Sequence, residues 1–180
     1  YTFGFLKLSE NTKSAAAGGY LISSLDSNDV NSGYLNPANT IDAHKNQLSV
    51  NFLPLKQGIK NTSLVYVASL PKVGLLNFNI QHIGYGQIDA TDEFGNNIGQ
   101  ISPQEFAIGV SKSYHQGYFS MGGGLQFAGS RFGNYGASAL LLDMGGTYRH
   151  PKKELTVSLV LDNIGFAISK YTEESQMNIP

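Results

Sequence analysis

The sequence predicts an all-β protein, a transmembrane antiparallel up-and-down β-barrel with a lipid-facing outside and a polar lumen. In residues 73–88, apolar side chains alternate with carboxamides, which is the pattern of a strand with two unlike faces. The apolar positions are Leu76, Phe78 and Ile80, and the carboxamides are Asn77, Asn79 and Gln81. Charged residues make up only 14% of the chain, against roughly 25% in soluble proteins. A large solvated surface is therefore not expected.

The apolar runs are too short for a membrane helix. The longest candidate, residues 64–70, falls well below the roughly 18 residues that such a helix needs. If this chain spans a bilayer, it does so with strands.

Residues 1–45 lose the alternation and are expected to pack in the barrel lumen. They combine a strand-like piece at 1–8, a small-residue run at 14–19 and a turn-rich part that ends in Asn36, Pro37 and Ala38. Asn closes turns by bonding the backbone and Pro fixes φ. This N-terminal motif is therefore interpreted as a structural turn.

Residues 46–165 are expected to form seven barrel strands, several of which reach the roughly 9–11 residues that cross a bilayer at a slant. Their ranges are 46–55, 61–70, 73–88, 104–114, 118–130, 139–149 and 154–165. Residues 166–180 are expected to be an extracellular loop that leads to a further strand. We thus expect the barrel to be incomplete in this chain, with its signal peptide removed or never included.

The same parity assigns faces in the later strands. The positions expected to face lipid are Phe106, Ile108, Val110, Leu140, Leu142, Met144, Leu155, Val157, Leu159 and Leu161. The alternate positions are small or polar, and among them Asp143 and Asp162 are expected to be lumenal acids. Buried charges need partners, and Arg149, a lysine or backbone amides of the N-terminal segment are the expected ones. An acid–base carboxylate pair is the alternative.

Loop lengths give an expected orientation. The connections at 71–72, 115–117 and 150–153 look short, and those at 56–60, 89–103, 131–138 and 166–180 look long. Outer-membrane barrels have short periplasmic turns and longer extracellular loops. Residues 89–103 are then the largest surface loop, and Asp92, Glu93, Phe94, Gly95 and Asn96 form the candidate partner loop. A merely solvated tip is the alternative.

Composition and spacing leave little room for other chemistry. The net charge is −1 and the 12 basic residues are scattered, so we expect no nucleic-acid partner. Cysteine is absent, and the four histidines lie far apart in the sequence. Gly122, Gly123 and Gly124 lack the Lys-Ser/Thr of a phosphate loop and are interpreted as a site of barrel bending. We expect no enzyme activity, catalytic residue, metal or cofactor.

Several segments in one order resemble the PorV and PorQ group of FadL-like outer-membrane barrels in Bacteroidetes. The segments are residues 13–19, Asp29-Val30, Asn36-Pro37-Ala38 and residues 162–165. Within the group, residues 91–96, the strand that holds residues 142–145 and the turn His150-Pro151 are more similar to PorQ than to PorV. The resemblance covers the chain from about Phe5 to Pro180.

The resemblance implies a non-enzymatic barrel of the type IX protein secretion system. It implies a place in the outer membrane of a Gram-negative bacterium, with loops exposed at the cell surface. PorQ-like proteins work with a PorZ-like surface protein, which they anchor, and with a PorU-like sortase and a PorV-like barrel in the same cell surface attachment complex. That complex releases cargo and attaches it to lipopolysaccharide, so the lipid bilayer and lipopolysaccharide are further expected partners.

Two other functions remain open at this stage. A FadL-like transporter of hydrophobic small molecules would need a lateral opening and an apolar pocket in the lumen. A soluble ligand-binding β-barrel would turn its apolar alternate face inward and expose Asn77, Asn79 and Gln81.

Overall fold

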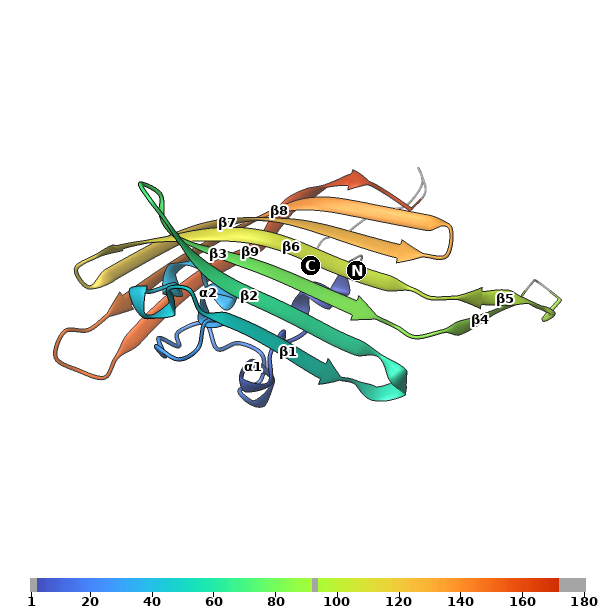
Figure 1. Cartoon of the computed structure of the whole chain (residues 1–180), viewed down its shortest axis with the longest axis horizontal. Coiled ribbons are helices and arrows are strands. Elements are labelled where there is room, and N and C mark those ends of the chain that lie inside the picture. The colour runs from blue at the N-terminus through green and yellow to red at the C-terminus, as the bar shows by residue number, and fades with distance from the viewer. Residues whose placement is uncertain (1–2, 92–93, 172–180) are drawn as a thin grey trace.

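The chain is built around one large antiparallel sheet that curls around its N-terminal segment (Figure 1). The computed structural model describes residues 3–91 and 94–171. The sheet has seven strands in the order β1-β2-β3-β6-β7-β8-β9. Their bounds are β1 Leu48–Pro54, β2 Lys60–Leu70, β3 Gly74–Gly84, β6 Gln104–Gln116, β7 Phe119–Phe132, β8 Tyr135–Arg149 and β9 Thr156–Ser169. The prediction of an all-β chain is confirmed.

Short helices make up much of the N-terminal segment, which we define as residues 3–45. They are η1 Gly4–Lys7, α1 Thr12–Ala16, α2 Ser32–Leu35, η2 Pro37–Asn39 and η3 Asp42–His44, and a further turn, η4 Lys56–Gly58, joins β1 to β2. Asn11 caps α1, because its side-chain oxygen accepts from the Ser14 amide at 2.7 Å. Gly18 and Gly19 follow with φ of 83° and 90°, values that glycine adopts without strain and that stop a helix. No helix of the described ranges is long and apolar enough to cross a membrane.

The sheet does not close within the described residues. Strands β1 and β9 pair on one side only and form its two edges. Barrel closure and membrane insertion therefore stay predictions.

The largest departure from the expected strands follows Gly84. The strand expected over 73–88 ends there, and Gly86 turns the chain with φ of 77°. The segment expected to be the largest loop contains a two-stranded ribbon, β4 (Ile88–Thr91) and β5 (Asn97–Ile101). This ribbon extends beyond the end of the sheet (Figure 1). We call that end of the sheet the hairpin end.

The expected alternation of short and long connections is wrong. At the hairpin end, β7 and β8 are joined by Gly133 and Asn134 alone, whereas a long loop was expected over 131–138. At the opposite end, the turn expected at 150–153 occupies residues 150–155. The strands continue further than the sequence pattern suggested, because glycine and small residues at their ends obscure the alternation. The connection 85–103 is the only long one in the described residues, so it alone distinguishes the hairpin end from the opposite end by loop length.

Strand β9 is also longer than expected. It runs to Ser169, past the boundary at residue 165, and residues 172–180 of the expected final loop lie outside the described residues. A register shift opposite Leu142 and Met144 places Asn163 in the left-handed region, with φ of 58°. Such a bulge inverts the facing parity. The apolar positions of β9 after the bulge become Ile164, Phe166 and Ile168, all exposed.

The two faces of the sheet differ as the alternation predicted. We call the face covered by the N-terminal segment the inner face and the opposite one the outer face. Asn77 and Gln81 are fully buried on the inner face, while Phe78 and Ile80 between them are 39% and 43% exposed. The carboxamides therefore belong to the covered side of the sheet.

Two apolar clusters lie on the inner face. The larger one, near the hairpin end, packs Phe3 and Phe5 against strand residues such as Ile83 and Leu141. The smaller one consists of Val30, Val65 and Val67. Both clusters join the N-terminal segment to the sheet, so they fix the position of the polar contacts between them.

Candidate functional site

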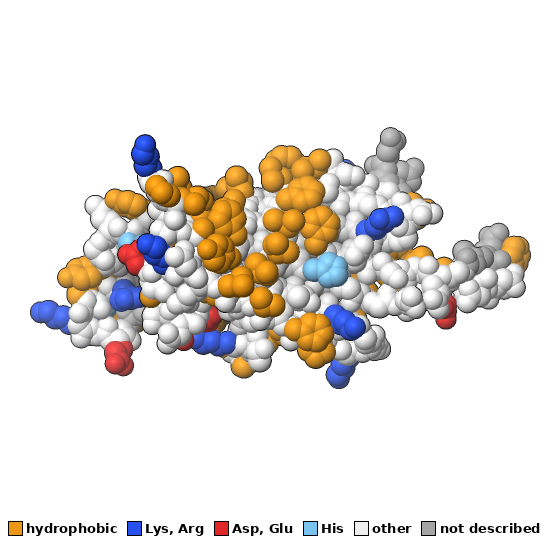
Figure 2. All heavy atoms as spheres, viewed as in Figure 1, with side chains coloured by type: hydrophobic (Ala, Val, Ile, Leu, Met, Phe, Trp, Pro, Cys, Tyr) orange, Lys and Arg blue, Asp and Glu red, His pale blue; other side chains and the backbone are white. Residues whose placement is uncertain are grey.

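The outer face carries a continuous apolar band. Cross-strand neighbours on this face line up in rows, and two central rows are apolar on all seven strands. One row is Val50, Leu64, Ile80, Ile108, Phe127, Leu140 and Phe166. The next is Leu48, Tyr66, Phe78, Val110, Leu125, Leu142 and Ile164. Figure 2 shows hydrophobic side chains gathered over the middle of this face.

The height of the band is comparable with that of the apolar band on transmembrane barrels. On β7 it runs from Phe119 to Phe127, about 27 Å along a strand at about 3.4 Å per residue. A tilt of about 40° reduces this to roughly 21 Å, close to the apolar band of about 25 Å on outer-membrane barrels. Toward the hairpin end the band stops at a polar row that contains Lys60, Gln104 and Arg131.

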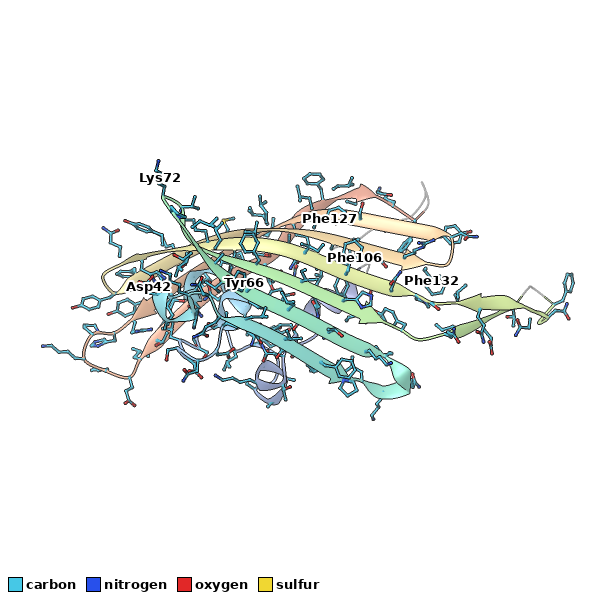
Figure 3. All side chains as sticks on the ribbon, in the orientation of Figure 1. Asp42, Tyr66, Lys72, Phe106, Phe127 and Phe132 are labelled. Atoms are coloured by element: carbon cyan, nitrogen blue, oxygen red, sulfur yellow. The ribbon has the colours of Figure 1, made fainter. Side chains whose placement is uncertain are left out.

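Aromatic side chains and one lysine interrupt the aliphatic surface. Phe106 and Phe127 lie on neighbouring strands (Figure 3), with ring centroids 6.0 Å apart. Near the opposite end, Phe119 and Tyr148 stack with centroids 5.0 Å apart. Lys112 lies within the band, between the central rows and that end. Its long stem can cover apolar surface while the ammonium reaches toward the edge.

The inner face holds the N-terminal segment by a buried polar network centred on Thr147. The Thr147 hydroxyl donates to Asn39 Oδ1 at 2.8 Å and accepts from Asn36 Nδ2 at 3.0 Å. Asn36 also donates to the Ile22 carbonyl, and its Oδ1 accepts from the Ala38 amide, both at 3.0 Å. Asn36 and Asn39 are 0% exposed and Thr147 is 4% exposed. The structure thus places the N-terminal motif in direct contact with β8.

Two glycines make room for this turn. An added Cβ at Gly122 would lie 2.2 Å from the Pro37 carbonyl carbon, and one at Gly145 would lie 2.0 Å from Asn36 Oδ1. No side chain fits at those distances. The sheet and the turn therefore approach each other more closely than any residue except glycine allows.

A second contact holds Thr40, two residues after the motif. The Thr40 carbonyl accepts from Ser113 Oγ at 2.6 Å and from His115 Nε2 at 2.7 Å. Because a carbonyl only accepts, His115 Nε2 carries the proton, and its Nδ1 accepts from Ser120 Oγ at 2.7 Å. His115 falls in the connection expected at 115–117, but it belongs to β6. Its side chain is exposed and still binds the N-terminal segment.

Strand β2 binds the start of the segment. Asn61 donates to the Ser9 carbonyl at 2.9 Å and Ser63 donates to the Glu10 carbonyl at 2.7 Å. The Glu10 side chain is 2% exposed and accepts from Asn11 Nδ2 at 2.8 Å. Burial, with a smaller contribution from the nearby Asp29 charge, raises the pKa of Glu10 to about 7. This carboxyl group therefore titrates near neutral pH.

An ion-pair group lies at the surface of the segment. Lys13 Nζ is 2.6 Å from Asp26 Oδ2 and 3.3 Å from Asp29 Oδ2. The hydrogen bond to Asp26 raises the pKa of Lys13 and lowers the pKa of Asp26. Exposed pairs of this kind stabilise little. The group mainly fixes α1 against the turn that precedes α2.

The two expected lumenal acids line a cavity of about 190 Å³ between the segment and the inner face. Asp143 accepts from the Asn163 amide at 2.8 Å, so this partner is a backbone amide from the β9 bulge rather than Arg149, a lysine or an amide of the N-terminal segment. Glu10 and Tyr34 line the same cavity, and burial raises the pKa of the Tyr34 hydroxyl. Among the described residues, no three histidine, aspartate or glutamate side chains gather closely enough to hold a metal ion.

The candidate partner loop is the tip of the β4–β5 ribbon. Asp92 and Glu93 lie outside the described residues. Phe94 is 82% exposed, and Gly95 turns the tip with φ of 83°. Asn96 leads into β5, which pairs with β4 alone. The loop residues that the structure describes are therefore accessible to a partner.

Comparison of this chain with protein-family models, with curated proteins and with solved structures finds no match.

Proposed function

We propose that this chain is part of the wall of an outer-membrane β-barrel that anchors a surface partner and carries out no reaction. The observation that carries the proposal is the apolar band on the outer face. Seven strands contribute to its two central rows, and nothing in the described residues covers it. A soluble monomer rarely exposes a contiguous apolar patch of this extent. A lipid bilayer covers such a band without further protein contacts.

The inner face supports the same proposal. In a soluble ligand-binding barrel the apolar alternate face would point inward. Here the central inward positions of β3 are Asn77, Asn79 and Gln81, all buried under the N-terminal segment, while Leu75 and Ile83 near its ends pack in the two apolar clusters. Polar inward and apolar outward residues are the arrangement of transmembrane barrels.

The β4–β5 ribbon is the part of the molecule best placed to meet a partner. It extends beyond the sheet (Figure 1) and presents Phe94 at its tip. Recognition is commonly carried by loops on a rigid scaffold. On the resemblance to the PorV and PorQ group, the partner is a PorZ-like surface protein of the type IX secretion system, with a PorU-like sortase and a PorV-like barrel in the same complex. The hairpin end is then the extracellular one.

A FadL-like transporter of hydrophobic small molecules is the second candidate. The observation that favours it is the apolar cluster on the inner face near the hairpin end, where Tyr85 and Tyr171 border Ile83 and Leu141. Phe3 and Phe5 of the chain itself occupy that cluster. A transported molecule would have to displace them.

Arginine substitution on one strand tests the membrane assignment. Ile108 lies in a central row and Gln104 lies on the same face of β6 at the polar edge. In lipid vesicles, Ile108→Arg should destabilise the folded chain by roughly 2–4 kcal/mol and Gln104→Arg by about 0–1 kcal/mol. The measurement is urea unfolding of the vesicle-bound chain.

A water-exposed face gives a different result. Ile108 is 49% exposed, and surface substitutions in water usually change stability by only about 0.5 kcal/mol. Equal, small effects at both positions would refute the membrane assignment.

A further inference from the structure

A groove interrupts the apolar band near the end opposite the hairpin. It has a volume of about 740 Å³ and follows three neighbouring strands, β7, β8 and β9. Its outer-face lining residues are Phe119, Met121, Gly146, Tyr148, Val157 and Leu159. It is thus a depression in the apolar band, lined mainly by apolar side chains.

Gly146 forms the floor of the groove. Its cross-strand neighbours are Met121 on β7 and Leu159 on β9, and both walls are more than half exposed. An added Cβ at Gly146 would meet no atom within 4 Å. The space above this glycine is therefore open to an elongated apolar group.

Basic side chains lie where the groove reaches the end of the sheet. Tyr148 and Val157 line the groove, and residues 150–155 join their strands. The connecting turn carries the exposed cations Lys152 and Lys153. Among the described residues, neither lysine has a carboxylate within ion-pair distance. The backbone amides of Lys152 and Lys153 both donate to His150 Nδ1 at 3.1 Å, which fixes the turn beside the groove.

We propose that this groove binds one membrane lipid with an anionic headgroup. The acyl chain lies over Gly146 between Met121 and Leu159, and the headgroup phosphate meets Lys152 and Lys153. The proposal rests on the proposed membrane function, because the groove is continuous with the apolar band. The basic residues complement the charge of a lipid phosphate, and each lysine or arginine near a membrane surface strengthens binding to anionic lipid about fivefold.

The test uses the whole chain reconstituted in bilayers of phosphatidylglycerol and phosphatidylcholine with the same acyl chains. Native mass spectrometry after release from the bilayer counts the lipids that stay bound. The expected result is one retained phosphatidylglycerol in preference to phosphatidylcholine. Inorganic phosphate should not displace it, since phosphate has no acyl chain to place in the groove.

Two matched substitutions separate the groove from the general lipid surface. Gly146→Leu fills the groove and should abolish retention. Gly123→Leu adds the same side chain to the same band outside the groove, where an added Cβ has only the Asp143 carbonyl oxygen at 3.8 Å, and should retain the lipid.

Charge substitutions make the second comparison. Lys152→Gln with Lys153→Gln should weaken the preference for phosphatidylglycerol about fivefold for each lysine removed. Lys56→Gln with Lys60→Gln, at the hairpin end, should leave it unchanged.

The outcomes distinguish the two proposals. A chain that inserts but retains both lipids equally, keeps its lipid after Gly146→Leu, or loses it to inorganic phosphate overturns the lipid site and leaves the membrane function standing. Equal, small effects of Ile108→Arg and Gln104→Arg in vesicles overturn both.

Discussion

Gly145 and Gly146 are adjacent on β8 and face opposite sides of the sheet, so the same substitution has opposite consequences. At Gly145 a new methyl group would lie 2.0 Å from Asn36 Oδ1, whereas at Gly146 it meets no atom within 4 Å. We expect Gly145→Ala to displace the Asn36 turn. Gly146→Ala should leave the turn in place.

The magnitude follows from what holds Asn36. Overpacking of this kind costs about 1–3 kcal/mol. The Asn36 side chain cannot move aside freely, because it bonds Ile22, Ala38 and Thr147. Loss of one or two of these bonds costs about 1 kcal/mol each, so Gly145→Ala should destabilise by about 2–5 kcal/mol. Gly146→Ala should stabilise by about 0.5–1 kcal/mol, since alanine loses less backbone entropy than glycine in a strand.

Two measurements check this prediction on the refolded chain. Urea unfolding gives the change in stability, and hydrogen exchange of the peptide that contains Ala38 reports the turn directly. Gly145→Ala should speed exchange at the Ala38 amide, and Gly146→Ala should not. Equal stability and equal exchange in the two variants would show that the turn does not dock on β8.

Three further outcomes are expected. Because the pKa of Glu10 is raised to about 7 from 4.5, the folded state binds its proton more tightly. Protonation of Glu10 therefore stabilises the fold by up to about 3 kcal/mol. This contribution is complete below about pH 4.5 and is lost as pH rises through 7. The free energy of unfolding in urea should show this loss in the unsubstituted chain and not in Glu10→Gln. Thr147→Val leaves buried Asn39 Oδ1 without its donor and should cost about 1–3 kcal/mol in the same assay, whereas Thr62→Val, on the outer face, should cost less. An epitope inserted after Gly95 should bind antibody on intact cells and one inserted after Gln116 should not; the reverse pattern would invert the proposed orientation.

The strands could be predicted because each carries its own two-residue period. Leu76, Phe78 and Ile80 reveal the outer face without knowledge of any other strand, and β6 and β8 repeat the pattern. The prediction failed where the alternation or the end of a strand depends on its pairing with a neighbouring strand. The bulge at Asn163 depends on the pairing of β9 with β8, and the two-residue turn at Gly133 and Asn134 depends on how far both flanking strands pair.

The candidate site could be predicted from the sequence only in part, for the same reason. The small residues Gly145 and Thr147 indicated an inward face. Nothing near them in the sequence predicts that they contact Asn36 and Asn39. His115 is exposed beside a tight turn, and nothing next to it in the sequence indicates that it binds the Thr40 carbonyl. Its alternation with Ser113 on β6 was the signal that could have placed it on the inner face.

The sequence by itself determined the periodicity, the low charge and the apolar band, since these follow from side-chain order along each strand. Tertiary structure alone decided which inward side chains meet the N-terminal segment, because those contacts join residues about a hundred positions apart, such as Asn36 and Thr147. It also decided that Gly122 and Gly145 are sites of close approach while Gly146 is the floor of an open groove. A glycine has no side chain whose polarity or size indicates its surroundings. Only the residues packed around it in the folded chain determine whether the space above its Cα is filled or free.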